Sequence, residues 1–199
     1  MASIKDIPEK KGPNPQYPVI DEISKRWSPR AFDPKDISDD NLYQLFEAMR
    51  WAPSSMNAQP WRILFARRGD EAFNKLHEAL SPNNKSWTED APILMLAMVK
   101  KHLSDGSING SAKHDLGLAM GNLLAQATSM GIGVHQMGGF SKEKVIDLLE
   151  IPDEFIPNTM VAIGYYGNPD QLPDKLKTRE LNPRTRMEIS DFVFQNSLK

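Results

Sequence analysis

Two clusters of basic and polar residues carry side chains that can bind a phosphorylated ligand. The first consists of Arg26, Trp27, Ser28, Pro29 and Arg30. A guanidinium group offers a planar fork of donors that fits phosphate oxygens, and Ser28 adds a hydroxyl donor. The second cluster is the pair Arg184 and Arg186 near the other end of the chain. Each cluster alone is more typical of a solvated surface turn, so only the two together indicate a phosphate site.

A polar loop is predicted immediately after an apolar helical pattern. The segment reads Pro53, Ser54, Ser55, Met56, Asn57, Ala58, Gln59, Pro60 and Trp61. Proline ends the helix, and the residues after it offer hydroxyls and amides. Taken alone, this pattern is as typical of an ordinary loop as of a binding site.

A glycine pair, Gly138 and Gly139, follows a short predicted strand that contains Gln136. Paired glycines after a strand usually mark a tight turn, but glycine also lets backbone N–H groups approach a ligand closely. Asn84 lies in a polar stretch, residues 83–87, which we expect to be a loop before an apolar strand. Asparagine there is also typical of a turn.

Alternating helices and strands are predicted to position these residues. Apolar periodicity and capping residues predict helices at 20–25, between Ser38 and Pro53, and at 70–80, 114–130 and 141–149. Apolar runs predict strands at 62–66, 92–99, 133–137 and 159–165, with a further strand at 191–194. The helix at 114–130 is apolar nearly all round and includes Gly117 and Gly121, so we expect protein to surround it, with a partner subunit supplying part of the cover.

Composition excludes several classes of protein. The chain has 199 residues, a net charge of -2 and no cysteine, which excludes disulfide scaffolds, thiolate metal sites and a cysteine nucleophile. The charge indicates no nucleic-acid partner. No apolar run reaches the roughly 18 residues of a membrane span, and the charged N-terminus is unlike a secretory signal, so we expect a cytoplasmic protein. The four histidines lack metal-ligand spacing, and we expect no metal site.

From about Ile20 to the C-terminus, these segments together resemble the FMN-dependent nitroreductase family. That family binds the FMN phosphate with an Arg-x-Ser-x-Arg turn near the start and a basic-x-basic pair near the end. Its Ser-x-Asn-x-Gln-Pro-Trp loop contacts the flavin of the other subunit. The resemblance implies an α+β three-layer sandwich in which a central mixed sheet is flanked by helices. It also implies an intertwined homodimer with FMN at the subunit interface.

The resemblance implies a set of FMN-binding residues and no catalytic acid or base among the side chains. The set is Arg26, Trp27, Ser28, Arg30, Pro53, Ser54, Ser55, Asn57, Asn84, Gln136, Gly138, Gly139, Arg184 and Arg186. Residues 53–57 would act from the partner subunit. Gln136 would lie against one face of the ring, and the glycine pair would aim main-chain donors at flavin N5. Many relatives have an acidic residue where Gly138 stands, and Met187 and Glu188 also depart from the family's pattern.

The implied activity is ping-pong electron transfer from NAD(P)H through FMN to a nitroaromatic or quinone-type acceptor. The alternatives are other flavin chemistry (dehalogenation or flavin turnover), a flavin sensor or carrier without nitroreductase turnover, and a non-flavin dimeric scaffold. We expect residues 1–19 to form an extended arm. Residues 20–199 are expected to form a single FMN-binding domain whose C-terminal tail embraces the partner.

Overall fold

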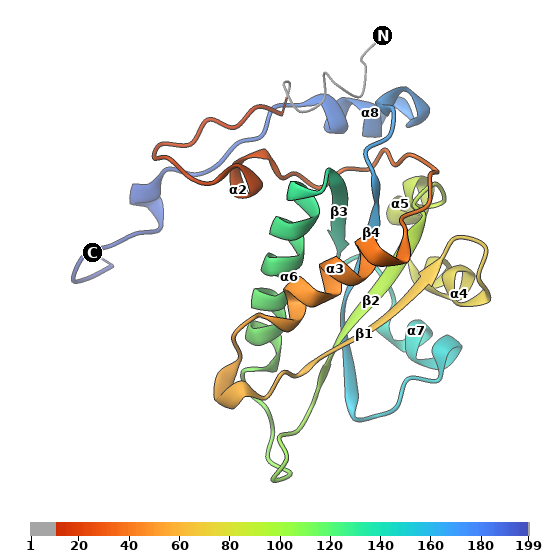
Figure 1. Cartoon of the computed structure of the whole chain (residues 1–199), viewed down its shortest axis with the longest axis vertical. Coiled ribbons are helices and arrows are strands. Elements are labelled where there is room, and N and C mark those ends of the chain that lie inside the picture. Colours follow the sequence, from red (N-terminus) through yellow and green to blue (C-terminus); the bar gives the residue numbers. More distant parts are fainter. Residues whose placement is uncertain (1–10, 199) are drawn as a thin grey trace.

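A four-stranded sheet lies at the centre of the fold (Figure 1). The computed structural model describes residues 11–198. The strands are β1 (Trp61–Arg67), β2 (Ile93–Lys100), β3 (Ile132–Met137) and β4 (Phe155–Tyr165), in the order β1-β2-β4-β3. Every neighbouring pair is antiparallel. The expectation of a mixed sheet is therefore wrong for the described part of the chain.

Helices cover both faces of this sheet and give it three layers. The helices are α2 (Asp21–Lys25), α3 (Asp39–Arg50), α4 (Glu71–Ala79), α5 (Pro82–Thr88), α6 (Ala112–Ser129), α7 (Lys142–Leu149) and α8 (Asp174–Leu181). Three 3₁₀ turns are added at η1 (Ser55–Asn57), η2 (Pro169–Gln171) and η3 (Ile189–Asp191). One core joins α3 and α6 to the sheet, and the other core joins α4, α5 and α7 to the opposite face. The α+β three-layer expectation is confirmed.

Strand β2 shows why there are two cores. Side chains of a strand alternate between faces. Accordingly, Met95 and Ala97 belong to the α3/α6 core, whereas Leu94 and Leu96 belong to the other. All four side chains are fully buried, which confirms the strand predicted from an unbroken apolar run.

Local capping defines several helix starts as the sequence predicted. The Ser38 hydroxyl accepts from the Asn41 N–H at 3.3 Å, and the Ser141 hydroxyl accepts from the Lys144 N–H at 3.1 Å. The polar stretch 83–87, expected as a loop, is instead part of helix α5. Pro82 at the first helical position has a backbone angle suited to a helix, and Trp87 anchors the turn in the core.

The two ends of the described chain run beside each other away from the sheet (Figure 1). Residues 12–19 are exposed, and Gln16 accepts from the Ile189 N–H at 3.3 Å. The strand expected at 191–194 is absent, because the described chain pairs no strand with this segment, whose residues remain exposed. The first ten residues of the predicted arm lie outside the described residues. Between residues 11 and 198, no helix is long and apolar enough to cross a membrane.

Candidate functional site

The turn at residues 26–30 follows the end of α2 and packs against the start of β3. The Pro29 carbonyl accepts from His135 Nδ1 at 2.8 Å. A Cβ placed on Gly133 would lie 2.6 Å from Pro29 Cγ, so only glycine allows this close approach. The Trp27 ring stacks on Tyr166 with centroids 4.3 Å apart. These contacts bury Trp27 and Pro29 and leave Ser28 exposed.

Three guanidinium groups gather at this turn. Burial lowers the pKa of Arg26, and the neighbouring Arg186 lowers it further. Burial also lowers the pKa of Arg184, and the charges of Arg186 and Arg26 lower it further. Within residues 11–198, no carboxylate forms an ion pair with any of these three arginines. The structure therefore joins the two predicted basic clusters and leaves their positive charge in excess.

The side chains of these arginines are used differently. Arg26 Nη1 donates to the exposed Ser28 hydroxyl at 3.3 Å, so both groups lie on the outer side of the turn. Arg184 donates to three carbonyls, those of Lys11 at 2.7 Å, Arg26 at 2.6 Å and Ser24 at 2.7 Å. Arg184 thus links the C-terminal segment to the turn. Its remaining N–H groups could also donate to a ligand.

Glu180 is a buried member of the site that the sequence analysis missed. Its side chain accepts from Trp27 Nε1 at 3.2 Å and from the Arg30 N–H at 3.0 Å. The Arg30 guanidinium lies 4.0 Å from the same carboxylate. Burial raises the pKa of Glu180. The sequence offers little signal for this role: residues 174–181 are mostly polar, and no helix was predicted in this part of the C-terminal tail.

The glycine pair meets Asn84 at the other end of β3. Asn84 Nδ2 donates to the Gly139 carbonyl at 3.0 Å, and the Ser81 N–H donates to the same carbonyl at 2.9 Å. A Cβ on Gly139 would lie 2.9 Å from both Asn84 Nδ2 and Ser81 Oγ, whereas Gly138 faces open space. The structure therefore brings together two residues that the sequence placed in separate segments.

Strand β3 connects the basic turn with the glycine pair. It is an edge strand, because only β4 pairs with it in the described sheet. From Gly133 to Gly139 the backbone extends about 20 Å at the usual rise of a strand. Gln136 is exposed on this path, between the buried His135 and Met137. We call this surface, which runs along β3 from the turn to the glycine pair, the strip. It could bind an elongated ligand whose anionic end lies at the arginines.

His135 supports both ends of this strip without adding charge at neutral pH. Its ring lies 4.5 Å from that of Trp87 in α5, the helix that contains Asn84. Burial lowers the pKa of His135 to about 4, although its bond to the Pro29 carbonyl acts in the opposite direction. His135 is therefore a buried, hydrogen-bonded residue of the core.

The polar loop at 53–59 has an unusual backbone. Met56 and Asn57 both have φ of 53°, and Gln59 has φ of 45°. The Ser54 hydroxyl accepts from the Gln59 N–H at 3.0 Å, and Gln59 Nε2 donates to the Asn57 carbonyl at 3.0 Å. Gln59 therefore supports the loop.

Asp115 ties this loop to the first turn of α6. Its side chain is 1% exposed and accepts from the Ser55 N–H at 3.2 Å. An acidic residue is also favourable in the first turn of a helix, where Asp115 lies. The contact with the loop was not predicted from the sequence.

Within one chain, the loop and the basic turn lie at opposite ends of α6 (Figure 1). The helix has 18 residues, which correspond to a length of about 27 Å. Ser55 is bonded at its start, and Pro29 packs on Gly133 just after its end. The single chain therefore does not bring Pro53, Ser54, Ser55 and Asn57 to the other predicted site residues.

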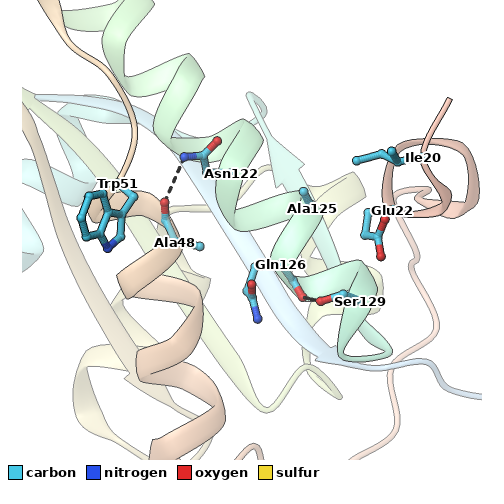
Figure 2. A pocket seen from close by; sticks show the side chains of 8 residues that line it. All are labelled: Ile20, Glu22, Ala48, Trp51, Asn122, Ala125, Gln126 and Ser129. Atoms are coloured by element: carbon cyan, nitrogen blue, oxygen red, sulfur yellow. Dashed lines mark hydrogen bonds between the residues drawn. The ribbon is translucent and has the colours of Figure 1, made fainter.

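A groove runs along α6 between α3 and the start of α2 (Figure 2). It is lined by Ile20, Glu22, Ala48, Trp51, Asn122, Ala125, Gln126 and Ser129. Trp51 is 73% exposed beside it. Further along α6, Gly117 and Gly121 are exposed, with open space where a Cβ would stand. Besides the sheet, α3 and α2 contact the central helix, and its face at Gly117 and Gly121 stays open in one chain. That a partner subunit covers this face stays a prediction.

Comparison with known proteins gives consistent matches. A family model described as Nitroreductase family matches residues 23–165. A crystal structure of an oxidoreductase containing FMN is 33% identical, covers 95% of this chain and 97% of its own, and has a TM-score of 0.90.

Two more distant matches also carry FMN in their descriptions. The FMN reductase [NAD(P)H] of Bacillus subtilis is 24% identical over 182 residues, which are 82% of this chain and 72% of the relative. A structure from Desulfovibrio desulfuricans in complex with FMN is 20% identical, covers 93% of this chain and 100% of its own, and has a TM-score of 0.72. The latter match shows the fold alone.

Proposed function

Because the chain belongs to the nitroreductase family, we propose that it is an FMN-dependent oxidoreductase that takes hydride from NAD(P)H and reduces nitroaromatic or quinone-type acceptors by a ping-pong mechanism. The observation that carries the proposal is the gathering of Arg26, Arg184 and Arg186 beside the Ser28 hydroxyl. A phosphate monoester carries about two negative charges at pH 7, which would offset most of this positive charge. The residues present therefore fit the phosphate of FMN.

The remaining predicted residues fit a flavin laid along β3. Arg26, Ser28 and Arg30, with Arg184 and Arg186, would bind the phosphate. Gln136 would lie against the ring, and the N–H groups of Gly138 and Gly139 would donate to it; Asn84 fixes the backbone of the glycine pair through the Gly139 carbonyl. When bound, FMN supplies the site for hydride transfer, and the protein binds and orients it. No side chain is required as a general acid or base.

The proposal requires a homodimer. The loop at 53–57 and the turn at 26–30 are at opposite ends of α6, so two copies with antiparallel α6 helices would place the loop of one beside the turn of the other. The groove of Figure 2 and the open positions at Gly117 and Gly121 provide a surface for this packing. Phe192, Val193 and Phe194 are exposed in one chain, and burial of apolar surface would favour their docking on the partner. Residues 20–199 would then form one domain that embraces its partner through this tail.

An absorption spectrum and an anaerobic reduction test the proposed activity. The purified protein, supplied with FMN, should retain the cofactor through gel filtration and elute as a dimer. NADH or NADPH should bleach the bound flavin, and nitrofurazone or a quinone should then restore its colour. Retention of FMN without bleaching would favour a flavin carrier or sensor, and bleaching without reoxidation by these acceptors would favour other flavin chemistry. Failure to retain FMN would refute the proposal.

A further inference from the structure

We propose that Glu180 is a positioning residue that gives the cofactor site its preference for a phosphorylated flavin; this inference rests on the function proposed above. Glu180 comes from α8, more than one hundred residues along the chain from the turn that it contacts. Its carboxylate reaches neither solvent nor the outer side of the turn, being 1% exposed. It would therefore act through the residues that bind phosphate rather than by touching the ligand.

The carboxylate holds the turn on both sides of Ser28. One oxygen accepts from Trp27 Nε1 at 3.2 Å and the other from the Arg30 N–H at 3.0 Å. Between these two points, His135 holds the Pro29 carbonyl at 2.8 Å. With the backbone fixed at these positions, the Ser28 hydroxyl faces outward beside the Arg26 guanidinium.

The charge of Glu180 is balanced by groups from more than one element. The Arg30 guanidinium lies 4.0 Å away, and Lys11 lies close enough for its charge and that of Glu180 to favour each other. Tyr166 stacks on Trp27. Burial raises the pKa of Tyr166 to about 12, so it is a neutral neighbour. A buried carboxylate is expensive unless it is paired and hydrogen-bonded, and here both conditions hold. The arrangement orients Arg30 while its guanidinium remains partly exposed.

Glutamine at position 180 tests this role because it cannot make both bonds. An amide offers one acceptor oxygen and one donor group, whereas Trp27 and Arg30 both present donors. The Glu180→Gln variant must therefore lose one bond and release one side of the turn. FMN and riboflavin share the same ring and differ in the phosphate, so their dissociation constants separate an effect on the phosphate end from an effect on the whole site.

The experiment is fluorescence-quenching titration of each apoprotein with FMN and with riboflavin. In the wild type, FMN should bind more tightly than riboflavin. In Glu180→Gln, the Kd of FMN should rise about tenfold, the effect of losing one bond to a charged group, while the Kd of riboflavin stays within about twofold. Trp27→Phe, which retains an aromatic ring but removes the indole donor, should shift the ratio in the same direction.

Asp170→Asn is the matched control, because Asp170 lies in η2, forms an ion pair with Lys177 of α8, and does not bond the turn. It should leave the FMN-to-riboflavin ratio unchanged. If Glu180→Gln weakens both flavins equally, leaves both unchanged, or tightens FMN binding, the positioning role is wrong while the proposed function stands. A wild-type chain that binds neither flavin would overturn both proposals.

Discussion

The turn at 26–30 is held by distant parts of the chain, whereas the loop at 53–59 is held mostly by bonds within itself. Glu180, His135 and Arg184 come from α8, β3 and the C-terminal segment, and each bonds the turn. Within residues 11–198, the loop has two side-chain ties from outside: Asp115 accepts from the Ser55 N–H, and Arg62 of β1 donates to the Gln59 carbonyl at 3.1 Å. Both segments present polar groups that are candidates for the same site, but the turn is held by more hydrogen bonds from other elements than the loop is.

The backbone angles of the loop sharpen this difference. Three non-glycine residues in it have positive φ, and each such conformation typically costs about 1 kcal/mol or more. The loop thus carries local strain with little support from its own chain. Under the proposed function, the turn binds phosphate in a preformed arrangement, whereas the loop completes its packing only against the partner.

Removing two arginines from the turn should have the largest effect on the proposed cofactor site. We expect Arg26→Ala combined with Arg30→Ala to raise the Kd of FMN at least about one-hundredfold, because each charge-assisted bond contributes about 1.5–3 kcal/mol. The purified variant should be colourless. Flavin absorbance after gel filtration and a quenching titration measure the change.

A control for charge alone is Arg68→Ala combined with Lys144→Ala. Arg68 donates to the Pro34 carbonyl and Lys144 pairs with Glu78, so neither residue contacts the turn or the loop. That protein should purify with the same flavin content as the wild type. Full flavin content in the variant of the turn would show that phosphate binds elsewhere.

Acid should loosen the turn through His135. Its pKa is about 4 in the folded chain and 6.5 ordinarily, so between these pH values the unfolded chain binds a proton that the folded chain does not. Stability should therefore be full above pH 6.5 and fall as the pH drops toward 4, by up to about 3 kcal/mol. Urea unfolding at several pH values measures this slope.

His135→Asn should flatten that part of the pH profile, although it lowers stability at pH 7. His102→Asn, at an exposed position, is the comparison variant and should retain the wild-type slope. An unchanged slope in His135→Asn would mean that other groups control the acid response.

Removing the contact between Asp115 and the loop should have an intermediate effect. Asp115→Ala deletes a buried acceptor of the Ser55 N–H and should lower the free energy of unfolding by about 1–2 kcal/mol. Under the dimer proposal, it should also weaken FMN binding, although Asp115 is far from the turn of its own chain. Glu143→Ala removes an exposed acidic residue from the first turn of α7 and should change neither quantity appreciably. Loss of stability with unaltered FMN affinity would argue against a contribution of the loop to the site.

Local patterns in the sequence were sufficient to predict the four strands of the sheet and the helices that pack on it, except α5. The caps at Ser38 and Ser141 and the buried strand β2 depend on neighbouring residues, and each is present. The meeting of Arg26 with Arg184 followed from the family resemblance rather than from any local rule. Spacing alone could not have predicted it, because the residues are far apart along the chain.

Features that depend on long-range packing were missed. Glu180 lies in a helix of mostly polar composition, and only the tertiary structure buries it against Trp27. The segment 191–194 has the composition of a strand, but a strand needs a neighbour that the described chain does not provide. The helix at Asn84 was missed because a short polar stretch with an asparagine is typical of a loop, although Pro82 favours a helix start.

The smallest predicted effect concerns strain in the loop itself. Met56 is 84% exposed with φ of 53°, a conformation that glycine adopts without steric cost. Met56→Gly relieves that cost but also makes the unfolded chain more flexible, so we expect a change within about 0.5 kcal/mol, in the stabilising direction. Met187→Gly is the matched control, because Met187 is 63% exposed and has no positive φ. It should lose stability by a similar amount, and urea unfolding of both variants gives the difference. If both methionines respond alike, the loop is not strained at this position, and the contrast between loop and turn would depend on their bonds alone.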